Sequence, residues 1–318
     1  MMVGKYFKPP YPLSIPVLFL IFNRLDTTEK VFEMIRRAKP PRFYVASDGP
    51  RHWKDGEKEK VENVRRYVLS NIDWDCKVKT LFRDRNLGCG KAISEAITWF
   101  FENEEMGIIL EDDCLPRLSF FWFCEELLKR YKDDLRVWHI AGFNPNLGWI
   151  RDPDYSYYFS SLGFVWGWAT WRDRWKNYDF NMSLLDEILG KGYVEDIGLS
   201  LEKDLPFFYA IRKGQLDTWD FQWGFTMAVN NGLSIIPCKN LVKNIGFGGG
   251  SLHTKSIFDM RANAKTSDVE FPLRHPPFLI RDRKSDERFL KKFWGAETER
   301  VIMRKLLALL GKVDFYNL

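Results

Sequence analysis

The first half of the chain alternates short apolar runs with stretches that have helical spacing of apolar residues. The run 15–22 is apolar except for its proline, which is typical of a strand buried on both faces of a parallel sheet. Three more strands are predicted at 43–47, 77–82 and 107–110. Helices are predicted between and after them, at about 26–38, 54–70, 89–102 and 119–131.

This alternation predicts an α/β fold with a mixed, mainly parallel sheet flanked by helices. In such sheets, ligands bind at the carboxyl ends of the strands, near a switch in strand order. Asp48 directly follows the second predicted strand, and Glu111, Asp112 and Asp113 directly follow the fourth. These acidic residues are therefore the first candidates for a functional site.

The second half is less regular and rich in aromatic residues, and it contains a glycine run at 246–250. No internal repeat or low-complexity linker divides the chain. We expect residues 1–258 to form the ligand-binding domain and residues 259–318 to form an irregular C-terminal extension packed on it. Within the extension, the prolines and mixed charge of 259–288 predict an extended stretch that wraps the surface.

The tail 299–313 has apolar residues on one helical face and basic residues elsewhere. We expect a helix docked on its own domain, and the alternative is a helix that lies on a membrane surface. The apolar run 15–22 is too short to span a bilayer, and no signal peptide is visible.

Charge and cysteine content narrow the class of partner and the compartment. The chain has 48 Lys and Arg against 43 Asp and Glu, a net charge of +5. Because these basic residues are spread out, they do not indicate a nucleic-acid partner, but they suit an anionic diphosphate. Five cysteines without a Cys-x-x-Cys pair argue against a structural zinc site and a disulfide framework. We expect a cytoplasmic protein, and the membrane alternative for the tail would place it at the inner face of the membrane.

The acidic triplet 111–113 would be costly to bury without a partner. A divalent cation is one such partner, since carboxylate oxygens suit hard ions such as Mn²⁺ and Mg²⁺. The alternative is an exposed acidic loop before the helix at Ser119.

With these motifs in place, the sequence resembles the GT-A glycosyltransferases, and most closely the N-acetylglucosaminyltransferase I family. The resemblance covers about 15–258 as an ordered series of short motifs. It implies a Rossmann-like GT-A fold, a nucleotide-sugar donor such as a UDP-sugar, and a divalent metal. The family enzymes in question carry a Golgi membrane anchor that this chain lacks, so a shared acceptor does not follow.

The resemblance assigns the donor side residue by residue. The last acid of the triplet, Asp113, would hold the metal, and Glu111 and Asp112 would contact the ribose and sugar. The remaining donor contacts would come from Arg24, Asp48, Lys91 and Ser251. From the residues alone, His253 is a candidate to complete the metal shell or to hydrogen-bond the diphosphate, with a plain mobile loop as the alternative. Again from the residues alone, Arg24 could instead form an ion pair with Asp26, and Asp48 could instead begin a turn with Gly49-Pro50.

The acceptor side is assigned in the same way. Trp219-Asp220 resembles the family's Trp-Asp pair, in which the Asp is the catalytic base. The family has two acids after the Trp, whereas Phe221 follows Asp220 here, and Asp217 is the alternative base. From the residues alone, Asp220 fits either a base or the N-cap of a helix at about 222–230. Trp166, Trp168 and Trp219 are the candidates for acceptor contacts, with core packing as the alternative.

The sequence therefore predicts a metal-dependent glycosyltransferase that acts with inversion on a glycan or glycolipid hydroxyl. One alternative is a nucleotidyltransferase that makes sugar nucleotides. It needs a glycine- and Arg/Lys-rich loop after the first strand, and 22–26 contains no glycine. The other alternative is a non-catalytic carbohydrate-binding relative, against which the intact triplet argues.

Overall fold

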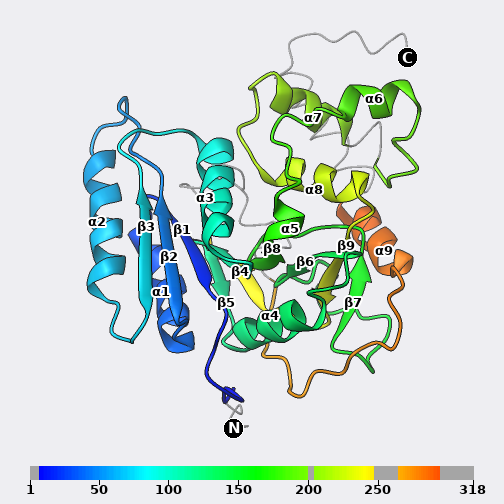
Figure 1. Ribbon diagram of the computed structural model, residues 1–318, viewed down its shortest axis with the longest axis horizontal. Helices are drawn as coiled ribbons and strands as arrows, with labels where there is room; N and C mark the ends of the chain where they lie inside the picture. The colour runs from blue at the N-terminus through cyan, green and yellow to red at the C-terminus, as the bar shows by residue number, and fades with distance from the viewer. Residues whose placement is uncertain (1–6, 200–203, 247–263, 294–318) are drawn as a thin grey trace.

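The computed structural model describes residues 7–199, 204–246 and 264–293. An eight-stranded sheet runs through the molecule in the order β3-β2-β1-β4-β8-β6-β9-β7 (Figure 1). The strands of this sheet are β1 (Val17–Ile21), β2 (Arg42–Ser47), β3 (Lys77–Phe82), β4 (Met106–Glu111), β6 (Val137–Ala141), β7 (Tyr157–Ser160), β8 (Trp168–Trp171) and β9 (Leu233–Pro237).

The sheet is mixed and mainly parallel, as the sequence predicts. Strand β1 pairs in parallel with β2 on one side and with β4 on the other, and β2 pairs in parallel with β3. Strand β8 lies antiparallel between β4 and β6, and β7 is antiparallel to β9 at the edge. The order reverses around β1 and β4, and their carboxyl ends are therefore the expected ligand-binding edge.

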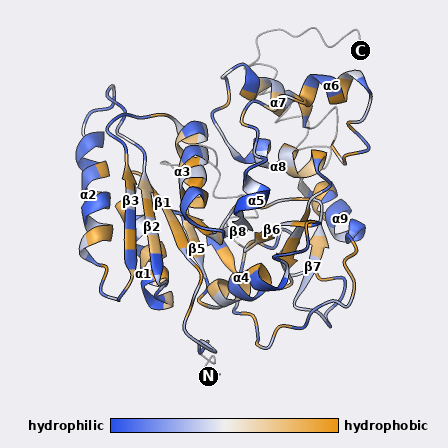
Figure 2. Cartoon of the chain, in the orientation of Figure 1, coloured by the Kyte–Doolittle hydropathy of each residue, from blue (hydrophilic) through white to orange (hydrophobic). Residues whose placement is uncertain are grey.

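Helices cover both faces of the sheet, in three layers. Along β1, Val17, Phe19 and Ile21 pack into one core cluster, while Leu18 and Leu20 pack into a second cluster on the opposite face. The first cluster contains apolar residues of α1 (Leu25–Ala38), α2 (Glu57–Ser70) and α4 (Ser119–Arg130). The second contains those of α3 (Cys89–Asn103), α5 (Arg172–Trp175) and α8 (Asp220–Val229). This burial on both faces explains why the central strands are apolar throughout (Figure 2).

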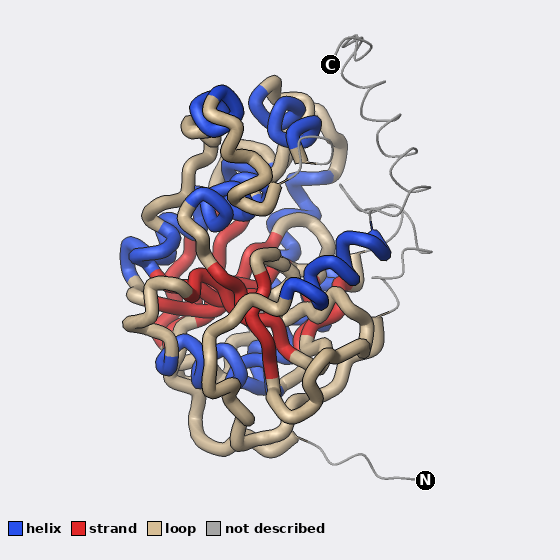
Figure 3. The backbone as a smooth tube through the Cα atoms, turned by 90° about the vertical axis from the view of Figure 1, so that its right-hand side faces the viewer, coloured by secondary structure: helices blue, strands red, loops and turns tan. Residues whose placement is uncertain are grey.

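Two short strands and three further helices complete the described part. Strand β5 (Cys114–Pro116) pairs antiparallel with β10 (Val242–Asn244), which brings the start of the glycine run beside the acidic triplet. Helices α6 (Leu185–Gly190) and α7 (Leu205–Arg212) lie together at the top of Figure 1. Helix α9 (Arg283–Phe293) lies beside β7 and is seen from the side in Figure 3.

The structure corrects the sequence prediction at three helix starts. Residues 283–293 are helical, although an extended stretch was predicted through 288, because Asp282 accepts the Ser285 N–H (3.2 Å) and the last proline of the stretch is Pro277. Helix α2 begins at Glu57 and not at about residue 54. Helix α1 begins at Leu25, one residue before the predicted start, so Asp26 lies inside its first turn. The boundary at 258/259 and the tail helix at 299–313 lie outside the described residues.

A buried histidine sits among the tryptophans of the second cluster. His139 is fully buried, its ring stacks on Trp168, and its Nδ1 accepts the Trp223 indole N–H at 3.2 Å. Its Nε2 lies 3.0 Å from the Phe164 carbonyl oxygen, to which it donates. Burial lowers the pKa of His139 from 6.5 to about 4.

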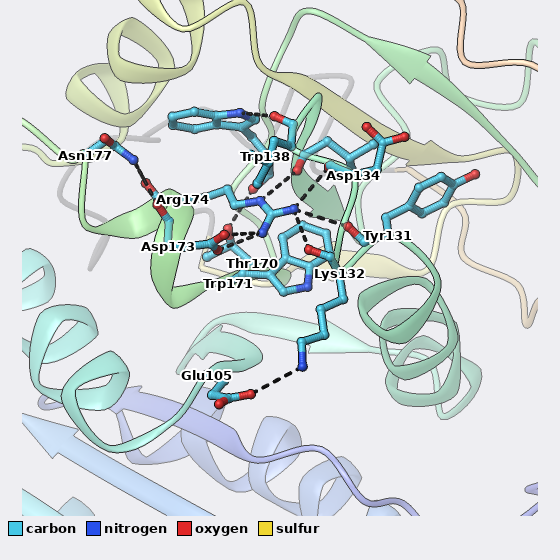
Figure 4. A network of polar contacts seen from close by, with 12 residues as sticks. Glu105, Tyr131, Lys132, Asp134, Trp138, Thr170, Trp171, Asp173, Arg174 and Asn177 are labelled. Carbon is cyan, nitrogen blue, oxygen red and sulfur yellow. Dashed lines mark hydrogen bonds and ion pairs between the residues drawn. The ribbon is translucent and has the colours of Figure 1, made fainter.

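Arg174 is a buried cation that joins the start of α5 to the chain between α4 and β6 (Figure 4). Only 3% of its side chain is exposed. The guanidinium donates to both carboxylate oxygens of Asp173 and to four backbone carbonyl oxygens, and it stacks over the Trp171 ring at 4.6 Å. Those carbonyls belong to residues 131, 132, 134 and 137. The planar, five-donor shape of arginine is required to satisfy them together.

We predict that His139 makes the protein less stable in acid. The unfolded chain binds a proton at this histidine below pH 6.5, whereas the folded chain does so only near pH 4, so stability is lost as the pH falls between these values. The loss is about 3 kcal/mol at pH 4. In denaturant titrations, the free energy of unfolding should fall less between pH 7 and pH 4.5 in His139→Gln than in wild type. An equal fall in the two proteins would contradict the prediction.

We also predict that Arg174→Lys lowers the free energy of unfolding by about 3 kcal/mol, because an ammonium group leaves several buried carbonyls without a donor. Arg136→Lys is the matched control, since 66% of the Arg136 side chain is exposed. Its effect should stay within about 0.5 kcal/mol in the same urea titration. Equal effects of the two substitutions would show that the Arg174 network does not stabilise the fold.

Candidate active site

The acidic triplet lies where β4 leaves the sheet beside the end of β1. Glu111 is the last residue of β4 and is in register with Leu20 of β1. Asp112 is 3% exposed, and its Oδ2 accepts the backbone N–H of Phe22 at 3.2 Å. The triplet is therefore not a solvated acidic loop, because Asp112 is bonded to the backbone just beyond β1.

Arg24 pairs with the triplet and not with Asp26. Its Nη2 donates to Asp112 Oδ1 and, at 3.0 Å, to Asp113 Oδ2. The Arg24 side chain as a whole is 26% exposed. Arg24 occupies the position before the first residue of α1, which directs its side chain from the end of β1 toward β4.

The triplet carries more negative charge than Arg24 neutralises. Burial, together with the nearby charges of Asp113, Asp112 and Asp220, raises the pKa of Glu111 well above its usual range. Burial and the charge of Asp113 raise the pKa of Asp112 to about 6, although Arg24 opposes the shift. A second positive charge at this edge would therefore stabilise the ionised triplet.

These residues fit a divalent cation held in part by a substrate. Among the described residues, no group of three or more His, Cys, Asp or Glu side chains is arranged to hold a metal ion. Ions such as Mg²⁺ are often bound through one or two carboxylates plus substrate phosphates and water. Asp113 suits that role, since its side chain is 15% exposed and its Oδ1 accepts only a weak bond from the Cys114 thiol at 3.4 Å.

The start of the glycine run closes against the same carboxylate. A Cβ atom at Gly246 would lie 2.2 Å from Asp113 Oδ2 and 2.7 Å from Arg24 Nη1, so only glycine fits there. The Ile245 N–H also donates to the Asp113 carbonyl oxygen at 2.8 Å. Ser251 and His253, which the sequence assigns to the donor, lie outside the described residues.

Asp48 has its acceptor positions filled by the chain itself. Its carboxylate accepts the backbone N–H groups of Gly49 (2.9 Å), Leu87 (3.0 Å) and Gly88 (3.2 Å), and the Asn86 side-chain amide at 2.8 Å. A carboxylate has about four lone-pair sites. In this conformation Asp48 therefore joins the end of β2 to the loop before α3, and a contact to the nucleobase would require it to release a donor.

Asp217 binds the two backbone N–H groups that follow those bound by Asp48. Its carboxylate accepts the N–H groups of Cys89 (2.7 Å) and Gly90 (2.8 Å), at the start of α3. The four consecutive N–H groups from Leu87 to Gly90 thus all donate to Asp48 or Asp217. Such a row of donors at a helix N-terminus is suited to phosphate, but here two side chains of the protein occupy it.

Asp220 is the first residue of α8, and its negative charge acts on the triplet. No hydrogen bond from its side chain caps the helix, and its Oδ1 accepts the Thr218 hydroxyl. Its charge contributes to the raised pKa values of Glu111 and of the Cys89 thiol, which places it near both. The N-cap alternative for Asp220 is therefore not what the structure shows.

The other predicted site residues, three tryptophans and Lys91, differ in how far they are buried. Trp168 is fully buried and Trp219 is 2% exposed, and their rings stack on each other at 5.5 Å. This burial favours the packing alternative for both. Trp166 is half-buried, against Phe143 at 4.6 Å, and Lys91 is exposed on α3 and pairs with Glu95 at 3.8 Å.

Sequence reasoning missed a charged group at the edge of the site. Glu57 is 1% exposed, and it accepts the Asn23 side-chain amide at 2.8 Å and the Arg51 guanidinium. Although burial alone would raise it, the hydrogen bonds and charge of Arg51, with the charge of Lys54, lower the pKa of Glu57 to about 2. Arg51 in turn lies over the Phe22 ring at 5.5 Å. Nothing in the spacing of 22, 51 and 57 shows that these residues meet.

We predict that Gly90→Ala destabilises the fold although alanine favours helices. The new Cβ would meet the Thr218 carbonyl oxygen at 2.5 Å and Asp217 Oδ1 at 2.9 Å. We expect a loss of about 1–3 kcal/mol in the free energy of unfolding. Gly224→Ala, in α8 with nothing within 4 Å of its Cβ position, should instead gain about 0.5–1 kcal/mol. A gain in both variants would show that the contact between α3 and residues 217–218 is loose.

No family model and no curated protein sequence matches the chain. Its fold is similar to mouse xyloside xylosyltransferase 1 in the apo form, with a TM-score of 0.33 and 12% identity over 67% of this chain and 81% of that one. It is also similar to a UDP-glucose pyrophosphorylase complexed with UDP-glucose (TM-score 0.31, 10% identity, 52% and 79%). A third such structure is HddC from Yersinia pseudotuberculosis complexed with GMP-PN (TM-score 0.30, 13% identity, 50% and 77%). Similarities of this size carry no argument about function.

Proposed function

We propose that the protein is a metal-dependent glycosyltransferase that uses a nucleotide-sugar donor. The observation that carries the proposal is the cluster of Glu111, Asp112 and Asp113 with Arg24 at the carboxyl ends of β1 and β4. An anionic ligand alone would be repelled by the three carboxylates. A divalent cation would bind the carboxylates, and a nucleoside diphosphate would bind the cation and Arg24, so the two together suit this edge.

The donor side supplies binding and orientation. Asp113 would hold the ion, here Mn²⁺ or Mg²⁺, and a bound ion would neutralise charge on the leaving diphosphate. Arg24, whose side chain is 26% exposed, is the candidate for contacts to phosphate oxygens. Glu111 and Asp112 are the candidates for the ribose and sugar hydroxyls. The close approach of Gly246 to Asp113 supports a role for the following glycine run in covering the donor.

The acceptor side centres on Asp220. In the proposed reaction an acceptor hydroxyl attacks the anomeric carbon, Asp220 takes the hydroxyl proton, and the nucleoside diphosphate leaves, with inversion at that carbon. Asp220 suits this step better than Asp217 does, because both Asp217 oxygens accept backbone N–H groups. Of the tryptophans, Trp166 is the candidate acceptor contact, since Trp168 and Trp219 are buried.

The finer assignments rest on the motif resemblance. It favours a UDP-sugar as donor, a hexosyl or N-acetylhexosaminyl group for transfer, and a saccharide or lipid-linked glycan as acceptor. We further propose a cytoplasmic protein, which the five free cysteines support. Within the described part of the chain, no helix has the length and apolar character needed to cross a membrane. A membrane contact through 299–313 remains a proposal.

Thermal melting with a panel of nucleoside diphosphates and nucleotide sugars, each with and without Mn²⁺, tests this function. A ligand at about a hundred times its dissociation constant should stabilise the fold by about 2.7 kcal/mol. We expect a Mn²⁺-dependent rise in melting temperature with one nucleotide class, and we expect Asp113→Asn to lose it. Asp133→Asn, which removes an exposed acid between α4 and β6, should keep the full rise.

Three other results would redirect the assignment. Formation of pyrophosphate and a nucleotide sugar from a nucleoside triphosphate and a sugar phosphate would favour the nucleotidyltransferase. A rise with glycans alone, without metal or nucleotide, would favour the carbohydrate-binding relative. A full Mn²⁺-dependent rise in Asp113→Asn would remove Asp113 from the metal site.

A further inference from the structure

The segment that carries Asp220, residues 217–220, is hydrogen-bonded at each of its residues, and two of them bond to other parts of the protein. At one end, Asp217 accepts the Cys89 and Gly90 N–H groups of α3. The Thr218 carbonyl oxygen accepts the Gln222 side-chain amide at 2.8 Å, and the Trp219 carbonyl oxygen accepts the Tyr178 hydroxyl at 3.1 Å. Asp220 itself accepts the Thr218 hydroxyl. The carboxylate of Asp220 therefore has little freedom as long as the segment stays in place.

The same segment is also linked by packing to β4, the strand that ends in the triplet. The Trp219 ring stacks on Trp168 of β8, with 23° between the ring planes, and Trp168 is in register with Ile109 of β4. Through this route, the base side of the site is tied to β4 by packing. Stacking alone fixes the distance between two rings but allows them to slide over each other.

The contact of Asp217 with α3 prevents the sliding of the segment that ring stacking alone would allow. Two hydrogen bonds from adjacent N–H groups to one carboxylate define both position and orientation, and the helix N-terminus strengthens them. Gly90 lets the segment approach so closely that the Thr218 carbonyl oxygen would lie 2.5 Å from a Cβ there. Asp48 holds the preceding residues of the same loop through Asn86, Leu87 and Gly88.

We infer that Asp217 is a positioning residue, which fixes the segment 217–220 against the first turn of α3 and so sets where Asp220 lies relative to the triplet. This inference rests on the proposed glycosyltransferase function. Asp217 then contributes to the rate of transfer without touching the substrates, and without contributing to donor affinity. A displacement of about 1 Å at a reacting group is enough to cost about 100-fold in rate.

The experiment compares wild type, Asp217→Asn, Asp217→Ala and Asp220→Asn. Turnover is measured as nucleoside diphosphate released, with water as acceptor, from the nucleotide sugar that raises the melting temperature most. Asp217→Asn retains one acceptor oxygen, so we expect kcat to fall about tenfold, and about 100-fold in Asp217→Ala. In both variants the dissociation constant of the nucleoside diphosphate with Mn²⁺, measured by calorimetry, should change less than about twofold. Asp220→Asn should release no product above background.

Asp268→Asn is the matched control. Asp268 is likewise a carboxylate from a segment far along the chain that accepts a helix-start N–H, that of Ser119 in α4 at 3.2 Å. Its ion-pair partner is Arg117 and not a residue of 217–220. Its kcat should stay within about twofold of wild type at a comparable loss of melting temperature. Hydrogen exchange adds a readout that does not depend on turnover. The amides of 218–223 should exchange faster in Asp217→Ala and at the wild-type rate in Asp268→Asn.

The outcomes separate the inference from the function on which it rests. Wild-type kcat and wild-type exchange in Asp217→Ala would overturn the positioning role and leave the transferase intact. Loss of all turnover in Asp217→Asn, with turnover kept in Asp220→Asn, would also overturn it and make Asp217 the base. If no nucleotide sugar raises the melting temperature of wild type with Mn²⁺ and none releases nucleoside diphosphate, the proposed function fails and the inference fails with it.

Discussion

The parallel pairing of β1 with β4 is the constraint on which the rest of the site depends. Both strands are buried on both faces, and a fully buried apolar side chain contributes about 1.5–3 kcal/mol to folding. A one-residue slip would exchange the two faces of each strand, so the register is strongly fixed. That register places the start of the triplet beside the end of β1. Arg24, Asp112 and Asp113 meet because the hydrophobic core leaves them no other arrangement.

Most of the acidic side chains at the carboxyl ends of these strands have hydrogen-bonding partners within the chain. Asp48, Asp217 and Glu57 each accept hydrogen bonds from backbone N–H groups or from a cation of the chain. Glu111 and Asp112 lie close to each other and to Asp113, and these like charges add to burial in raising the pKa values of both. The unfavourable charge is therefore concentrated at the point where a cation and a diphosphate would be bound. Local destabilisation of this kind is common where a protein keeps a site ready for a ligand.

Much of the fold could be predicted because its signals are local. The apolar run at 15–22 and the strand-to-triplet sequence 107–113 identify β1 and β4 without any knowledge of their partners. Helix α9 was missed because its apolar content is low and its stability comes from contacts with β7, where Asp286 accepts the Ser160 hydroxyl at 2.5 Å. The β5–β10 pair was missed for a similar reason, since three-residue strands carry too little pattern and Cys114 and Asn244 are 130 positions apart.

The sequence by itself determined the α/β architecture and the acids that follow its strands, because both depend on residue type and short spacing. It could not decide what those acids do. The tertiary structure decided that Arg24 pairs with the triplet and not with Asp26, that Asp48 and Asp217 serve the loop before α3, and that Trp168 and Trp219 belong to the core. The physical reason is that a carboxylate or an indole takes its role from its partners, and here those partners come from segments up to 128 positions away in the chain.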